Sequence, residues 1–162
     1  MLKLIYATFP GGRGGAALLL LRSFIGVAFL FHGYGKMIDV LGFAAVFGIP
    51  LPVAAAAAYT QFIGGVLMIL GAATPLAAAA LAATMAVATF ELIGRGEPFV
   101  NPHGHSWEAA AFYLVAASAM ALLGPGRFSV DALLLGRRGG ALSDVAPGAP
   151  LPLPSIQPPK GR

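Results

Sequence analysis

The chain has 162 residues, of which 58% are hydrophobic and only 10% are charged. Because about 25% of the residues in an ordinary soluble domain are charged, this composition excludes a soluble fold and indicates an integral membrane protein. The net charge of +4 does not indicate nucleic-acid binding, since the cations form no patch. Cysteine is absent, which excludes disulfides, iron–sulfur clusters held by thiolates and covalent haem attachment.

Four apolar stretches predict four membrane-spanning helices, at residues 16–36, 52–72, 75–94 and 107–124. Each approaches the roughly 20 residues that a helix needs to cross a bilayer. Inside lipid the backbone must satisfy its own hydrogen bonds, which favours helices. Pro50 and Pro52 mark the start of the second helix, a turn at Gly71 and Pro75 follows it, and residues 124–126 end the fourth. We therefore expect an all-α fold, an integral membrane four-helix bundle over residues 16–136.

The basic residues are distributed unevenly over this topology. Most of them precede the first span or follow the last, namely Lys3, Arg13, Arg127, Arg137, Arg138, Lys160 and Arg162. Cations gather in the cytoplasmic loops of membrane proteins, so we expect both termini in the cytoplasm. Residues 1–15 then form a cytoplasmic N-terminus, and the proline-rich residues 137–162 form a disordered cytoplasmic tail.

The first span carries a cation in the middle of its apolar run. A central Arg22 costs about 2.5–3.5 kcal/mol on insertion scales, so it needs a partner or a function. Its planar guanidinium suits a carboxylate, an oxyanion or a quinone carbonyl. The alternative is a structural role, in which Arg22 bonds backbone carbonyls and Gln61 or extends toward the interface.

Two further polar residues close the same span. His32 and Lys36 lie about 15 Å and about 21 Å beyond Arg22 along the helix, so they belong to a separate outer layer. His32 is suited to carrying protons near neutral pH. Lys36 is either a polar-site residue or an interfacial anchor at the helix end.

Helical spacing also places polar groups on one face of the second and third spans. In the second span this face holds Gln61, Gly64, Gly65 and Met68, and in the third span it holds Thr84, Ala88, Glu91 and Arg95. Because polar stripes avoid lipid, we expect them to be buried together. The resulting candidates for a polar or cofactor-binding site are Arg22, His32, Lys36, Gln61, Glu91 and Arg95.

Two of these assignments have simpler alternatives. Glu91 and Arg95 stand four residues apart, as in an ordinary ion pair on a helix surface. The small residues Gly33, Gly64 and Gly65 suit close helix packing, which lipid-immersed bundles require.

The loop before the fourth span holds a candidate metal site. His103 and His105 with Glu108 would supply two imidazoles and a carboxylate, a set that binds zinc or non-haem iron. The pattern lacks a third fixed ligand from elsewhere in the chain, so these residues are equally typical of a polar loop.

Three motifs in chain order resemble the DoxX family. They are Arg22 with the closing run FHGYGK of residues 31–36, the run QFIGG of residues 61–65, and the run GPGRFSVD of residues 124–131. The family pattern has an arginine early in span one, an h-G-x-x-K ending, E-x-x-G-G in span two and a G-x-G-R-x-S-x-D close. Gln61 departs from it, because it stands where the family has glutamate and cannot titrate.

The resemblance implies a four-span protein of the bacterial inner membrane. The family is similar to the small membrane subunit of thiosulfate:quinone oxidoreductase, so the resemblance implies a redox subunit that interacts with quinone or another lipid-soluble carrier. A partner subunit or a homo-oligomer is then expected, and nucleic acid is not. The alternative function is a non-enzymatic membrane scaffold or a small-molecule transporter, so an oxidoreductase activity of the chain itself stays open.

Overall fold

The computed structural model describes residues 9–135, and this part of the chain consists of helices joined by turns and loops, with no strand. The predicted all-α class is thereby confirmed. The helices are α2 (Gly12–Ile38), α3 (Val40–Phe47), α4 (Leu51–Leu70), α5 (Thr74–Gly94), α6 (Glu108–Leu123) and α7 (Val130–Leu135). The predicted tail at residues 137–162 lies outside the described residues.

Three of the described helices, α2, α4 and α5, are long and apolar enough to cross a membrane. The predicted fourth span corresponds to α6, which is also apolar but has only 16 residues. At about 1.5 Å per residue it is about 24 Å long, shorter than the roughly 30 Å of a hydrocarbon core. Large apolar side chains are exposed on all four helices, including Phe24, Ile63, Phe90 and Val115. Such a surface suits lipid, so the chain is a membrane protein.

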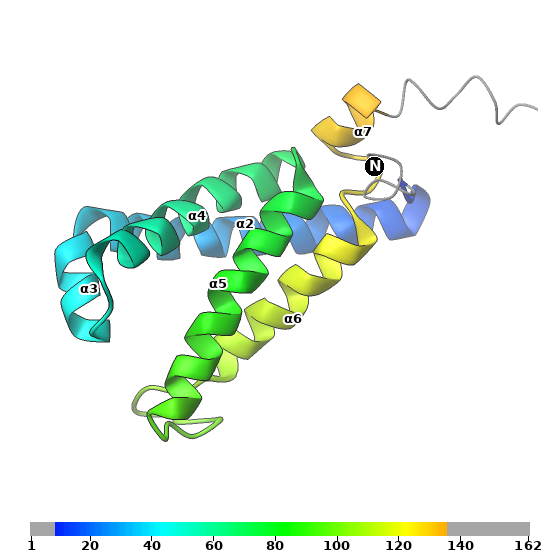
Figure 1. Cartoon of the computed structure of the whole chain (residues 1–162). Coiled ribbons are helices and arrows are strands. Elements are labelled where there is room, and N and C mark those ends of the chain that lie inside the picture. The colour runs from blue at the N-terminus through cyan, green and yellow to red at the C-terminus, as the bar shows by residue number, and fades with distance from the viewer. Residues whose placement is uncertain (1–8, 136–162) are drawn as a thin grey trace, which may run out of the picture.

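The helices form two pairs, as Figure 1 shows. Helices α2 and α4 pack along each other, as do α5 and α6, and α4 contacts α5. The pairs meet at the end of the molecule that holds α7 and diverge toward α3 and the loop after α5 (Figure 1). A buried apolar core joins all four helices, with Leu18, Ile25, Phe29, Met68, Ala78, Leu81, Met85, Ala117 and Met120.

Glycines let α2 and α4 approach closely. A Cβ at Gly26 would lie 2.7 Å from the Gly65 carbonyl oxygen, and one at Gly33 would lie 2.3 Å from the Phe62 nitrogen. Neither position can carry a side chain without separating the two backbones. Gly64 instead faces α5, where a Cβ would meet the Leu81 side chain at 2.9 Å. The crossing of α2 over α4 thus depends on small residues, as is typical of helix pairs in membranes.

Two short helices were not predicted. Helix α3 begins after Asp39, whose carboxylate accepts a hydrogen bond from the Gly42 amide at 2.7 Å, and ends at Gly48 in the left-handed region with φ of 63°. Its eight residues are too few to span a membrane, so this segment was expected to be a loop. Helix α7 begins at Val130, within the run of residues 124–131 that comes after α6.

Candidate functional site

Arg22 is almost completely buried, with 2% of its surface exposed. Its Nη1 donates a hydrogen bond to the Pro125 carbonyl oxygen at 3.2 Å, and its Nη2 donates to the Phe128 carbonyl oxygen. Both acceptors are backbone groups in the segment that connects α6 to α7. A buried guanidinium stabilises such a segment because it satisfies carbonyls that helix ends leave unpaired.

Asp131, in the first turn of α7, joins that helix to the turn between α4 and α5. The Asp131 carboxylate accepts hydrogen bonds from the amides of Ala73 and Thr74 at 2.7 Å and 2.9 Å, and its own amide donates to the Gly71 carbonyl at 3.0 Å. A Cβ at Gly71 would lie 1.8 Å from Arg22 Nη1. Arg22, the turn between α4 and α5, and the segment after α6 therefore form one interlocked end of the bundle.

The beginning of α2 lies at this same end. The Arg127 amide donates a hydrogen bond to the Pro10 carbonyl oxygen at 2.9 Å. The chain entering α2 and the chain leaving α6 are thus neighbours, with exposed Arg13 and Arg127 beside them. This is the arrangement that an even number of crossings produces.

The expected contact between Arg22 and Gln61 is absent, which corrects that expectation. Gln61 lies in the middle of α4, about 15 Å along the helix from Gly71 at the Arg22 end, and its Oε1 accepts a hydrogen bond from Lys36 Nζ at 2.7 Å. Gln61 is 2% exposed, and the Lys36 ammonium also lies over the Phe43 ring, 5.0 Å from its centroid. The polar stripe of α2 thus serves two separate places, the interlocked end at Arg22 and a buried polar pair at Lys36.

The Lys36–Gln61 pair lies between two cavities. The larger, of about 330 Å³, lies between α3, α4 and α5 and is partly open. The smaller, of about 190 Å³, lies toward α6 and is lined by His32 and Tyr113 as well as the pair. We call the larger one the Lys36 cavity; its lining also includes Phe43, Phe47, Val53, Ala57, Thr60, Thr84, Val87 and Glu91.

Within the described residues, no acidic side chain forms an ion pair with Lys36. Among residues 9–135 the only ion pair joins Arg95 and Glu91. The Gln61 amide nitrogen donates no hydrogen bond to another described residue. Both Lys36 Nζ and this amide nitrogen therefore retain hydrogen-bonding capacity beside the cavities.

The polar stripe of α5 is not buried, contrary to expectation. The buried face of α5 consists of Leu81, Met85 and Thr89 with residues nearer its start, and α5 packs on α6 and, at Leu81, on Gly64 of α4. Thr84 and Ala88 are half-buried and Glu91 is exposed, and all three line the Lys36 cavity. Of the predicted polar residues, the structure brings Lys36, Gln61 and Glu91 to one cavity.

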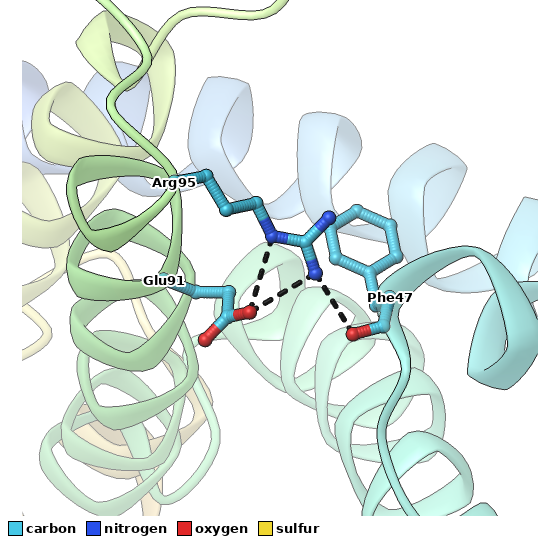
Figure 2. A network of polar contacts seen from close by, with 3 residues as sticks. All are labelled: Phe47, Glu91 and Arg95. Atoms are coloured by element: carbon cyan, nitrogen blue, oxygen red, sulfur yellow. Dashed lines mark hydrogen bonds and ion pairs between the residues drawn. The ribbon is translucent and has the colours of Figure 1, made fainter.

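Arg95 and Glu91 form more than the surface pair that their spacing indicates. Arg95 donates to Glu91 Oε1 from Nε at 3.1 Å and from Nη2 at 3.0 Å, and Nη2 also donates to the Phe47 carbonyl oxygen at 2.8 Å. Figure 2 shows the guanidinium between the carboxylate and the end of α3, beside the Phe47 ring. Because Phe47 and Glu91 both line the Lys36 cavity, this contact fastens α5 to α3 across one edge of it.

The remaining predicted residues do not line the Lys36 cavity, although His32 lines the smaller cavity beside it. His32 is exposed and meets the Tyr113 ring edge-on, with centroids 5.8 Å apart. His103 and His105 are exposed in the loop before α6. Within residues 9–135 no three His, Cys, Asp or Glu side chains are grouped so that they could hold a metal. The structure therefore does not gather His103, His105 and Glu108 into a metal centre.

Sequence reasoning missed the aromatic residues Phe43 and Phe47. They stand four residues apart in α3, their rings lie 5.0 Å apart, and both line the Lys36 cavity. The sequence does contain a signal for α3, since Asp39 precedes a run of eight apolar or small residues and can cap a helix. Recognising that short helix would have placed both rings near Lys36.

Comparison with known proteins tests the family resemblance. The DoxX family model matches residues 17–93, which include the first three long helices with Arg22, Lys36 and Gln61. The run of residues 124–131 lies beyond the match. No curated protein and no solved structure matches the chain. The resemblance is thus confirmed, since residues 17–93 of the chain match the DoxX family model.

Proposed function

We propose that this chain is a membrane subunit of a redox system and that it binds a quinone, or a similar lipid-soluble carrier, in the Lys36 cavity. The carrier's ring occupies the space between α3, α4 and α5. The electrons come from a partner subunit, and the chain itself binds and orients the carrier. The system belongs to the bacterial inner membrane, as the family resemblance implies.

The observation that carries this proposal is the Lys36–Gln61 pair, in which Gln61 is buried and Lys36 is half-buried, beside a partly open apolar cavity. Buried polar groups in a membrane are costly and tend to mark ligand sites. Among the described residues Lys36 donates one of the three hydrogen bonds that an ammonium can donate, and the Gln61 amide nitrogen donates none. A quinone carbonyl oxygen accepts hydrogen bonds from such donors, while the walls of the cavity match the rest of the molecule.

With an amide at position 61 instead of a carboxylate, Lys36 is not held in a salt bridge, and its ammonium can bind a neutral, electron-rich ligand. A glutamate at this position, as in the family pattern, would neutralise Lys36 across the same 2.7 Å contact. The amide keeps the hydrogen bond but leaves the ammonium charge unbalanced within the described residues. That charge is then available to polarise a carbonyl. Phe43 and Phe47 supply aromatic faces on which a planar ring can stack.

We further propose that α6 is a fourth span and that both termini are cytoplasmic. Helix α6 packs along α5, which is long enough to cross the bilayer. Trp107 precedes α6 and is half-buried, and aromatic residues of this kind mark membrane interfaces. The neighbouring positions of Pro10 and Arg127 support an even number of crossings.

The scaffold alternative is favoured by one observation, the bonding of Arg22. Within the described residues its hydrogen bonds all go to backbone carbonyls, so Arg22 acts in holding the bundle together. We therefore assign carrier binding to Lys36 and Gln61 and leave Arg22 out of the site. If the chain were only a scaffold, or a transporter for other molecules, it would show no quinone binding that depends on Lys36.

The test is equilibrium binding of a short-tailed quinone to the purified protein in mild detergent. We expect wild-type protein to bind it and Lys36→Met to lose at least about tenfold in affinity, the loss of one charge-assisted hydrogen bond. Thr89→Val is the matched control, because Thr89 bonds only to Met85 on the α6-facing side of α5. Equal affinities of all three proteins, or no binding by the wild type, would contradict the proposal.

A further inference from the structure

A second groove runs along the seam between α4 and α5. It has a volume of about 360 Å³ and is open on one side. Its walls are formed by Ile63, Gly64 and Leu67 of α4 and by Leu76, Ala77 and Ala80 of α5. It begins near Ala73, at the interlocked end, where α4 turns into α5. We call it the seam groove.

The seam groove adjoins the Lys36 cavity. Both are lined by Ala56 and Thr60 of α4, so the two spaces lie next to each other. On α5 the seam groove is lined from Ala73 to Ala80, and the Lys36 cavity from Ala83 to Glu91. At about 1.5 Å per residue, the combined channel is about 27 Å long. That length is far greater than the width of one aromatic ring.

Polarity changes along this channel. The Lys36 end holds an ammonium, a buried amide and the Glu91 carboxylate. The seam groove has only the hydroxyls of Tyr59 and Thr60 among its side chains, and these lie where it approaches the Lys36 cavity. An amphiphile with one polar head and one long apolar tail therefore fits in a single orientation, with its head at Lys36.

We propose that the seam groove binds the long apolar tail, of the prenyl type, of the carrier whose ring lies at Lys36. This inference rests on the proposed function and extends it by naming the substrate class, a long-tailed rather than a tailless quinone. The two spaces adjoin along α4 and α5, and the charged residues line only the Lys36 cavity, which supports this single occupant. Tail burial adds affinity because each methylene group removed from water contributes to binding.

The experiment compares two ligands, a tailless benzoquinone and the same ring carrying a decyl tail. The measured quantity is the ratio of their affinities for each protein in the same detergent. Ala80→Phe fills the seam groove from α5, where Ala80 is exposed and lines it. Ala79→Phe is the matched control, since Ala79 is equally exposed but lines no part of the groove. Comparing the two variants cancels the greater partition of the tailed ligand into micelles.

We expect wild-type protein and Ala79→Phe to prefer the tailed ligand equally. In Ala80→Phe the ratio of the two affinities should fall about tenfold, the effect of removing about two methylene groups of the tail from the groove. Its affinity for the tailless ring should be unchanged. Ile63→Trp, from the opposite wall, should act in the same way and replaces Ala80→Phe if that variant does not fold.

The outcomes separate this inference from the proposed function. If the tailless ring binds through Lys36 while Ala80→Phe and Ala79→Phe retain the same tail preference, the seam groove does not hold the tail and the proposed function stands. Loss of co-purified phospholipid from Ala80→Phe with an unchanged tail preference would assign the groove to a lipid and overturn the inference. Failure of the wild type to bind either quinone would overturn both.

Discussion

At the scale of single residues, two cations on α2 have different tasks. Arg22 bonds the carbonyls of Pro125 and Phe128, whereas Lys36 bonds the side chain of Gln61 beside a cavity. Both are buried or half-buried in a helix that suits a membrane, where an unpaired charge is unfavourable. The two terminal nitrogens of Arg22 bond backbone carbonyls and its Nε is buried without a partner, whereas Lys36 retains donors beside a cavity that a ligand can enter.

Replacing Arg22 should therefore affect stability rather than binding. Arg22→Met leaves one buried and one partly buried carbonyl without their donor, and we expect it to lower the free energy of unfolding by about 1–3 kcal/mol. Thermal unfolding in detergent measures this effect. Arg13→Met is the control, because Arg13 is exposed on the same helix, and it should change stability little. An Arg22→Met protein that keeps its stability but no longer binds quinone would contradict this account, because it would place Arg22 in the quinone site.

Restoring the family glutamate should weaken the proposed site. In Gln61→Glu the new carboxylate pairs with Lys36 at the position where Gln61 Oε1 lies, and it removes the amide donors. We expect a several-fold loss of quinone affinity without loss of folding, measured by the same equilibrium titration. Gln61→Asn, which keeps an amide, is the comparison. Tighter binding by Gln61→Glu would show that the ligand prefers a neutralised pair.

At the scale of elements, the crossing of α2 and α4 is the contact most sensitive to side-chain size. Gly33→Ala would place a Cβ 2.3 Å from the Phe62 nitrogen, whereas a Cβ at Gly35 meets nothing within 4 Å. We expect Gly33→Ala to destabilise the protein by about 1–3 kcal/mol through overpacking. Gly35→Ala should leave stability unchanged or raise it by up to about 1 kcal/mol, because alanine favours the helix. Melting curves that rank the two variants in the opposite order would exclude this packing.

The helices and part of the site were predictable from sequence periodicity. Gln61, Gly64, Gly65 and Met68 share a face by helical spacing, and all four are buried in α4. The partners of Arg22 were not predictable in this way. They are backbone carbonyls more than 100 residues away, and every residue has such an acceptor, so no side-chain pattern marks them.

The stripe on α5 was misjudged for a different reason. Thr84, Ala88 and Glu91 share one face, but α6 packs against another face with Leu81, Met85 and Thr89. In an alanine-rich helix several faces are equally apolar, so periodicity alone does not select the packed one. Contacts with the neighbouring helices determine which face of α5 is packed, and the face with Thr84, Ala88 and Glu91 lines the Lys36 cavity.

At the scale of the whole molecule, the interlocked end and the cavity end face opposite ways along the helices. The first gathers the start of α2, the turn between α4 and α5, and the segment after α6. The second holds α3, the end of α5 and the loop that leads to α6 (Figure 1). If α6 crosses the membrane, the cations Arg13 and Arg127 lie on one side, and His103 lies on the other.

The absence of cysteine makes this topology directly testable. Single cysteines at the exposed positions Arg13, His103 and Arg127 can be labelled in spheroplasts with a membrane-impermeant maleimide. We expect His103→Cys to react in intact spheroplasts, and Arg13→Cys and Arg127→Cys to react only after permeabilisation. Labelling of Arg127→Cys together with His103→Cys in intact spheroplasts would mean that α6 does not cross.

The central claim is that a quinone ring lies at Lys36 and not at Arg22. Photo-crosslinking with an azidoquinone, followed by mass spectrometric mapping of the labelled residues, tests it most directly. We predict labels on α3, α4 and α5 around the Lys36 cavity, at residues such as Phe43, Phe47 and Thr84, and their loss in Lys36→Met. Labels concentrated near Arg22 and the segment of residues 124–131, or labels unchanged in Lys36→Met, would contradict the claim.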